Sequence, residues 1–274
     1  MKSDIVKIAW WGKHFGEEPP LTGDKSQGAG GIFFAGCNLR CVFCQNYQIS
    51  QQGLAQREYS IEELAEMMLS LQKKGAINID LVSPTIWASQ IKTSVKLARK
   101  GGLAIPIVWN SNAFEAEAIL KEMAGIADIY LPDFKYGDDQ TAFKYSGVRN
   151  YVKVAERALR EMLKQAGHLK IENGIAKKGV IVRHLVLPGN IENSLKALEI
   201  IASIDRRIHL SLLNQFSPAH LALKFPELNR PVSEKEFQKV FDFAAELGFE
   251  NGWVQQGKSG NNFLPDFRKE NPFG

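Results

Sequence analysis

This 274-residue sequence is poor in cysteine: the whole chain has three, and all of them lie between positions 37 and 44. An odd number of thiols in one short run argues against a disulfide framework. The chain has no stretch of ~18 apolar residues, the length that a membrane span needs. Its first residues lack the long apolar region of a signal peptide. We therefore expect a cytoplasmic protein with reduced thiols and no membrane contact.

Charge of one sign is also scarce, because 34 lysines and arginines are balanced by 30 aspartates and glutamates, for a net charge of +4. The basic residues are spread among acidic ones, which is typical of a solvated surface and predicts no nucleic-acid partner. The hydrophobic fraction of 45% is ample for a large core. We expect one domain over residues 1–274, with an N-terminal extension at 1–30 and a C-terminal tail at 257–274.

The most informative pattern is the run Cys37-Asn-Leu-Arg-Cys41-Val-Phe-Cys44, which has metal-ligand spacing. Cubane iron–sulfur clusters usually take four thiolates, so three would leave one iron without a protein ligand and open to chemistry. A structural zinc site needs a fourth ligand. The nearest histidines, His14 and His168, are not at zinc-knuckle distance along the chain. We interpret the run as an iron–sulfur site, with a zinc-binding module as the alternative.

Apolar runs rich in β-branched residues alternate with helical patterns, which predicts βαβ units and a parallel sheet. Strands are expected at 31–35, 77–82, 105–110, 128–131, 179–187 and 207–214, with a short one at 253–255. Helices are expected at 60–74, 88–100, 115–123, 138–145, 151–166, 193–202 and 234–247. Six βα repeats are too few for a full eight-fold barrel. The predicted fold is α/β, a partial (β/α)6 TIM-like barrel with an open parallel sheet and outer helices.

Three further segments carry weaker expectations. His14, Glu17 and Glu18 form a polar cluster before the first expected strand, and we predict a surface turn there. The alternative is that the glutamate and histidine side chains line the entrance of a site. The segment 168–178 is predicted to be an exposed loop. The tail 257–274, polar and with proline and glycine, is predicted to be extended.

Polar residues follow the apolar runs at the carboxyl ends of the expected strands. Active sites of barrels and open α/β sheets lie at these ends. Any one such residue is more simply read as a helix cap or a turn. As a set on one rim, they predict a binding site.

The stretch from Gly28 to Asn46, with its three cysteines and with Phe43 before the third, resembles the signature of the radical SAM superfamily. Ser83-Pro84-Thr85 and the Asp-x-Lys at 133–135 are similar to motifs of its pyruvate formate-lyase activating enzyme-like group. The resemblance implies a radical SAM domain with a [4Fe-4S] cluster held by Cys37, Cys41 and Cys44. It also implies S-adenosylmethionine on the open iron, cleaved by one electron to a 5′-deoxyadenosyl radical that abstracts hydrogen.

The cofactor contacts implied by this resemblance match what S-adenosylmethionine carries. The aromatic residue before the third cysteine lies near the adenine in the superfamily. A lysine suits the carboxylate, hydroxyl groups suit the ammonium group, and a carboxylate or amide accepts hydrogen bonds from the ribose. The segment 183–189 resembles the fifth strand of the activating enzymes, where a basic residue lies near the cofactor. The expected contacts are Phe43, Ser83, Thr85, Asn110, Asp133, Lys135 and Arg183.

The implied activity is that of a radical SAM oxidoreductase similar to glycyl-radical-activating enzymes. Its partners would be a glycyl radical enzyme or a peptide, and an electron donor such as flavodoxin or ferredoxin. The activating enzymes carry Gly-Pro-Gly-x-Arg before the first strand, whereas this chain has Gly28-Ala-Gly-Gly and no such arginine. Radical modification of a small molecule or peptide therefore remains an alternative. A non-enzymatic iron–sulfur electron carrier is the alternative from another class.

Overall fold

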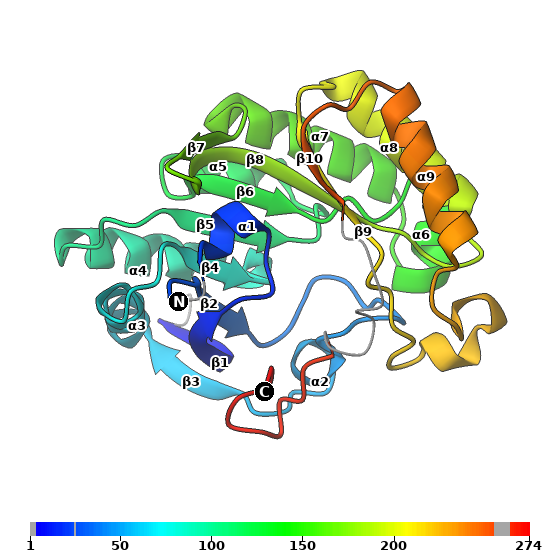
Figure 1. Cartoon of the computed structure of the whole chain (residues 1–274). Coiled ribbons are helices and arrows are strands. Elements are labelled where there is room, and N and C mark those ends of the chain that lie inside the picture. Colours follow the sequence, from blue (N-terminus) through cyan, green and yellow to red (C-terminus); the bar gives the residue numbers. More distant parts are fainter. Residues whose placement is uncertain (1–3, 25, 255–263) are drawn as a thin grey trace.

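The computed structural model describes residues 4–24, 26–254 and 264–274. Within these residues the strands form one ten-stranded sheet in the order β10-β9-β8-β6-β5-β4-β2-β1-β3, and β7 pairs with β8 beside this path. The path has two unjoined ends, β10 and β3, so the sheet is open. Figure 1 shows the sheet curving, with the longer helices along its outer side.

The parallel part of the sheet and the outer helices follow the predicted alternation. The parallel strands are β2 (Ala29–Phe34), β4 (Ile79–Val82), β5 (Ile107–Ser111), β6 (Ile129–Pro132), β8 (Ile175–Leu185) and β9 (His209–Leu213), with β10 (Gly252–Val254) at the edge. The helices between them are α3 (Ile61–Lys73), α4 (Ala88–Lys100), α5 (Glu117–Met123), α6 (Asp139–Ser146), α7 (Tyr151–Ala166), α8 (Ile191–Ile204) and α9 (Glu234–Glu246). The predicted α/β partial (β/α)6 barrel is confirmed. The short last strand is present as β10, and Gln255 lies outside the described residues.

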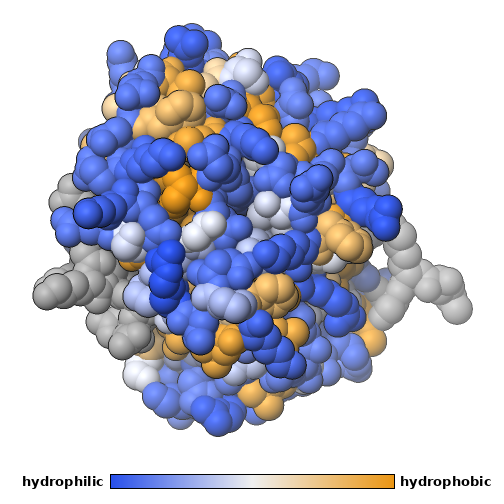
Figure 2. Space-filling model, turned by 90° about the vertical axis from the view of Figure 1, so that its right-hand side faces the viewer, coloured by the Kyte–Doolittle hydropathy of each residue, from blue (hydrophilic) through white to orange (hydrophobic). Residues whose placement is uncertain are grey.

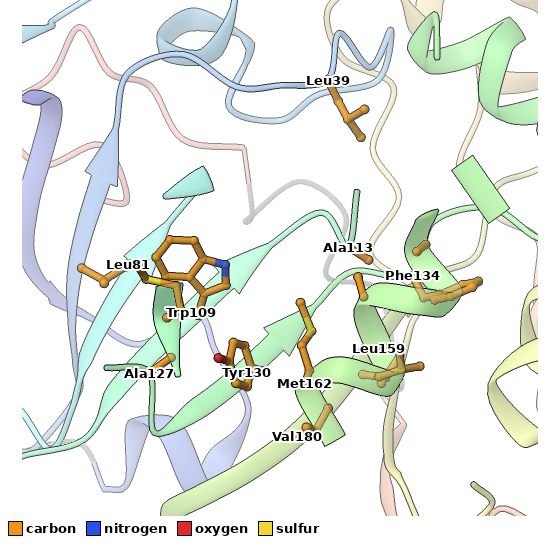
Figure 3. Packing of buried hydrophobic residues seen from close by; sticks show 14 of the residues in the cluster. Leu39, Leu81, Trp109, Ala113, Ala127, Tyr130, Phe134, Leu159, Met162 and Val180 are labelled. Carbon is orange, nitrogen blue, oxygen red and sulfur yellow. The ribbon is translucent and has the colours of Figure 1, made fainter. Parts of the chain in front are cut away.

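The central strands are covered on both faces, which explains why they read as nearly continuous apolar runs. All residues of β4, β5 and β6 are buried. Tyr130 of β6 lies on the outer face, and Figure 3 shows Leu159 and Met162 of α7 packing near it and near Val180. Helix α3 begins at a capping box in which Ser60 is the N-cap, as the Ser-x-x-Glu pattern predicts.

Three antiparallel strands are absent from the expectations. They are β1 (Ile5–His14), β3 (Arg57–Ser60) and β7 (Lys170–Glu172). Strand β1 pairs with β2 on one side and with the polar β3 on the other. The prediction of a loop at 168–178 is wrong, because β7 and the start of β8 form a hairpin. Its turn is Asn173-Gly174 with φ of 50° and 78°, a two-residue signal that the sequence already contained.

The N-terminal segment enters the barrel. The short helix α1 (Pro19–Thr22) lies across the middle strands in Figure 1. Its Leu21 is 1% exposed and packs with the inward-facing residues Val108, Ile129 and Ile181. The surface turn predicted for residues 14–18 is wrong for Glu17 and Glu18, whose side chains are buried because this segment closes the barrel floor.

The described C-terminal residues fold against the same side of the molecule as β1. The backbone turns, so that Asp266 N donates to Pro272 O at 2.9 Å. Phe267 is 3% exposed and packs with Phe33 and Val82, which face the barrel interior. The prediction of an extended tail is therefore wrong for residues 264–274, and residues 257–263 lie outside the described part of the chain.

Among the helices of the described residues, none is both long enough and apolar enough to span a membrane.

Candidate functional site

The three cysteines lie in the loop between β2 and α2 (Tyr47–Ser50), at the carboxyl end of β2. Cys41 is buried, whereas Cys37 and Cys44 are half-buried. All three line one cavity of about 470 Å³ that extends into the barrel. Among the described residues, no three histidine, cysteine, aspartate or glutamate side chains are grouped as ligands of a single metal ion would be.

Each thiol has a polar neighbour. Ser146 Oγ donates to Cys41 Sγ at 2.9 Å, and Asn112 Nδ2 donates to Cys37 Sγ at 3.3 Å. Cys44 Sγ lies 3.3 Å from Ser50 Oγ. Burial raises the pKa of Cys41, and it raises that of Cys44 to about 12.

These contacts suit an iron–sulfur cluster. Hydrogen bonds to the sulfurs and restricted solvent access are the means by which proteins tune such clusters. Buried thiols resist ionisation in the absence of positive charge, whereas bound iron would favour the thiolates. Three thiols that open into one cavity, each beside a hydroxyl or amide group, therefore fit a three-cysteine cluster.

Arg183 is the centre of a charged network across the cavity. Its Nε donates to Asp133 Oδ1 at 2.7 Å, and its two terminal nitrogens donate to Glu17 Oε2 at 2.6 Å and Asn110 Oδ1 at 2.7 Å. Lys135 Nζ donates to the second oxygen of Asp133, also at 2.7 Å. Asn110 belongs to β5, Arg183 to β8, and Asp133 and Lys135 to the loop after β6. The network therefore joins these strand ends to Glu17 of the N-terminal segment.

The network fixes the ionisation of its members. Burial alone would raise the pKa of Asp133, but Arg183 and Lys135 hold it at about 2. Burial also opposes ionisation of Glu17, yet Arg183 and His14 keep its pKa below the ordinary value. Two carboxylates thus balance two cations.

Asp80 and Glu18, below this network, behave differently. Burial raises the pKa of both, and neighbouring carboxylates add to the rise. Each has one buried oxygen without a hydrogen-bond partner among the described residues. Burial therefore favours the protonated form of both side chains.

Of the predicted cofactor contacts, six line the cavity together with the cysteines. They are Phe43, Ser83, Asn110, Asp133, Lys135 and Arg183. Ser83 has a left-handed backbone with φ of 59°, a conformation that costs energy for a residue other than glycine and is often found at functional turns. Thr85 points elsewhere: its hydroxyl donates to Glu115 Oε1 at 2.9 Å, and the Trp109 indole donates to the same oxygen at 3.0 Å.

Much of the cavity wall comes from residues other than the predicted cofactor contacts. Glu17 and His14 come from the segment before β2, and Phe33 comes from β2 itself. Asn271 and Phe273 come from the end of the chain. The ring of Phe273 lies 4.3 Å from that of His14 and 5.2 Å from that of Phe33, measured between centroids. The sequence marks His14 and Glu17 only as part of a polar cluster. No local pattern marks Phe33, Asn271 or Phe273, because the fold alone brings these residues to the cavity.

Comparisons with known proteins agree with this geometry. A family model described as the radical SAM superfamily matches residues 32–212. An uncharacterized protein of Methanocaldococcus jannaschii is 29% identical over 242 residues, which cover 84% of this chain and 64% of the relative. The chain thus spans less than two thirds of that relative's length.

Two solved structures are similar to the chain. Methylornithine synthase has a TM-score of 0.53 and 16% identity, over 80% of this chain and 61% of that one. A domain of pyruvate-formate lyase-activating enzyme from Bacteroides vulgatus has a TM-score of 0.46 and 15% identity, over 65% of this chain and 99% of that one. The family match covers more than half of the chain and includes the cysteine loop and the strands that carry the charged network. The chain belongs to the radical SAM superfamily, whose members use a [4Fe-4S] cluster and S-adenosylmethionine.

Proposed function

We propose that this protein is a radical SAM enzyme and that Cys37, Cys41 and Cys44 hold its [4Fe-4S] cluster. The observation that carries the proposal is that the three thiols and the Arg183 network line one cavity. When bound, the cluster supplies the electron that splits S-adenosylmethionine into methionine and a 5′-deoxyadenosyl radical, which abstracts hydrogen from the substrate.

The remaining cavity residues are proposed to hold S-adenosylmethionine. Lys135, already beside the thiol loop, is the cation for its carboxylate, and Asp133 keeps that lysine oriented. Asn110 and Ser83 offer an amide and a hydroxyl to the ribose and the ammonium group. Phe43, packed between Tyr136 and Phe216, offers a ring to the adenine.

The hydrogen donor is proposed to be a small molecule or a short peptide. The C-terminal segment forms one wall of the cavity through Pro265, Asn271 and Phe273, and its buried Phe267 anchors it. A protein loop would have to share the barrel with this segment. Activation of a glycyl radical enzyme, the other candidate, is supported by the motif at 133–135 and would show as a glycyl radical signal on such a partner in electron paramagnetic resonance.

The experiment is anaerobic reconstitution with iron and sulfide, followed by addition of dithionite and S-adenosylmethionine. We expect 5′-deoxyadenosine and methionine. Cys41→Ala should lose the cluster absorbance and the products. Ser146→Ala, which removes the hydroxyl that hydrogen-bonds to Cys41 and to Tyr136 but leaves all three thiols, should retain the cluster. Zinc in place of iron would point to a zinc-binding module, and an intact cluster without product would point to an electron carrier.

A further inference from the structure

The last turn of α6 contacts the cysteine loop twice. The helix ends at Ser146, and Gly147 after it takes the left-handed backbone, with φ of 69°, that is typical of a helix C-terminus. Val42 N donates to Tyr145 O at 2.8 Å, which fixes the backbone of the loop next to Cys41. Ser146 Oγ donates to Cys41 Sγ at 2.9 Å. The end of this helix therefore holds both the backbone and the thiol at one of the three cysteines.

The contact with Ser146 distinguishes Cys41 from the other two thiols. It is the shortest hydrogen bond to a sulfur among the described residues, because those of Cys37 and Cys44 are 3.3 Å or longer. Cys41 is also the most buried of the three, at 7% exposed. A hydrogen bond is electrostatically stronger in such a site, where little water competes for the donor.

A second hydroxyl group lies behind the first. Tyr136 Oη is 2.6 Å from Ser146 Oγ. A serine hydroxyl has one hydrogen, and Ser146 directs it to the sulfur, so Tyr136 is the donor in this pair. The hydrogen bonds thus run from Tyr136 through Ser146 to Cys41. Hydrogen bonds in such a chain polarise one another, so the tyrosine strengthens the donation by the serine.

Tyr136 is held firmly by the loop that follows β6. Its two neighbours in the chain are both fixed through their backbone. Lys135 N donates to the Tyr151 hydroxyl at 2.8 Å, and Gly137 N donates to Asn193 Oδ1 at 2.9 Å. The loop that carries the lysine of the charged network therefore also directs a hydroxyl group toward the cysteine loop.

The two hydroxyl groups are separated from solvent and from the cavity. Figure 2 looks onto the right-hand side of Figure 1, where α6 and α9 lie, and shows a mainly hydrophilic surface. Ser146 and Tyr136 are 2% and 0% exposed, so they are not part of this surface. Neither of them is among the described residues that line the cavity. They are therefore placed to act on the cysteine loop and not on a molecule bound in the cavity.

We propose that Ser146, supported by Tyr136, is a positioning residue that raises the reduction potential of the iron–sulfur cluster through Cys41. The inference rests on the proposed function, in which the three thiolates hold a [4Fe-4S] cluster. Reduction adds one negative charge to the cluster and its sulfurs. A hydrogen bond to a ligand sulfur stabilises this more negative form more strongly than the oxidised one. The two hydroxyl groups therefore make the reduced cluster easier to form.

The test is a redox titration of the reconstituted enzyme without S-adenosylmethionine, followed by the electron paramagnetic resonance signal of the reduced cluster. Ser146→Ala removes the hydroxyl group beside the sulfur, Ser146→Thr keeps a hydroxyl group there, and Tyr136→Phe removes only the second one. The control is Ser94→Ala, because Ser94 is 0% exposed and its hydroxyl donates at 2.9 Å to Ile61 O instead of a thiol. The control thus loses one buried hydrogen bond of the same length.

Ser146→Ala is expected to shift the reduction potential to a more negative value. At the midpoint potential of the wild type, its ratio of reduced to oxidised cluster should be about tenfold lower, which equals about 59 mV for one electron. Tyr136→Phe should shift the potential less and in the same direction, because the Ser146 hydroxyl still donates to Cys41. Ser146→Thr and Ser94→Ala should stay within about twofold of the wild-type ratio.

Three results would overturn the proposal. They are a wild-type potential in Ser146→Ala, an equal shift in Ser94→Ala, and a shift in Ser146→Thr as large as that in Ser146→Ala. If Ser146→Ala does not retain its cluster, Tyr136→Phe decides, because a negative shift supports the proposal and an unchanged potential overturns it. A wild-type protein that takes up zinc in place of iron, or one whose intact cluster gives no 5′-deoxyadenosine with dithionite, would instead refute the proposed function.

Discussion

Replacing Arg183 by methionine tests whether its charge holds the cavity network together. The arginine side chain is 15% exposed and contacts Glu17 and Asp133, whose own side chains are 7% and 27% exposed. The change removes the charge while keeping an apolar side chain of similar length, so both carboxylates lose their main cation. Breaking a buried ion pair in this way costs about 3–5 kcal/mol. The shift of Asp133 from a pKa of 3.8 to about 2 alone corresponds to about 2.4 kcal/mol, which agrees in size.

The sign of the pH dependence follows from the same carboxylates. In the wild type their pKa values are depressed, so the stability they contribute is present at pH 7 and is lost only as the pH falls below about 4. Without Arg183, burial should raise the pKa values of both carboxyl groups. Their protonation at lower pH then removes part of the destabilisation of the variant. Urea unfolding of the metal-free protein under reducing conditions should therefore show the largest deficit at pH 7 and a smaller one at pH 5.

The control for this experiment is Arg206→Met, at an exposed arginine, which should change stability by less than about 0.5 kcal/mol. If Arg183→Met were as mild as the control, or if its deficit did not depend on pH, the network would not be held by this charge.

Three further outcomes are expected from other parts of the chain. Burial lowers the pKa of His184 to about 4, so between pH 7 and pH 5 this side chain takes up a proton in the unfolded chain but not in the folded one. The free energy of unfolding should therefore fall by about 2 kcal/mol over this range. His184→Gln should remove that part of the slope, and an unchanged slope would contradict the assignment. Phe267→Ala removes a ring that is 3% exposed, worth about 3 kcal/mol, and should raise amide hydrogen exchange at 264–274, whereas Leu264→Ala should not. Ser60→Ala breaks the capping box of α3 and should cost about 1 kcal/mol in urea unfolding; no loss would mean that the cap is redundant.

The parts of the fold that could be predicted from the sequence are those set by local chemistry. The buried parallel strands appear as apolar runs because both of their faces are covered, and α3 begins at a capping box visible in four residues. Strand β3, with the sequence Arg-Glu-Tyr-Ser, has no such pattern and is ordered by pairing with β1. The β7–β8 hairpin is predictable from Asn173-Gly174, because this dipeptide favours the left-handed backbone that a two-residue hairpin turn requires.

The candidate site likewise contains residues that the sequence predicts and residues that only the fold brings together. The cysteine spacing is a local signal. Asp133 and Lys135 are predictable as site residues because they follow a strand, and this fold class places the carboxyl ends of its strands on one rim. The contact between Arg183 and Glu17 joins residues 166 positions apart, so no window along the sequence contains it. Thr85 looks equivalent to Ser83 in sequence, but its hydroxyl is directed to Glu115, which only the packing of the buried chain determines.

The most direct test of the central claim is quantitation of 5′-deoxyadenosine after anaerobic reconstitution and reduction in the presence of S-adenosylmethionine. We predict that the wild-type protein forms it together with an equal amount of methionine, and that Cys41→Ala forms neither. A wild-type protein that binds a [4Fe-4S] cluster with full occupancy, is reduced by dithionite, and still leaves S-adenosylmethionine uncleaved would contradict the account.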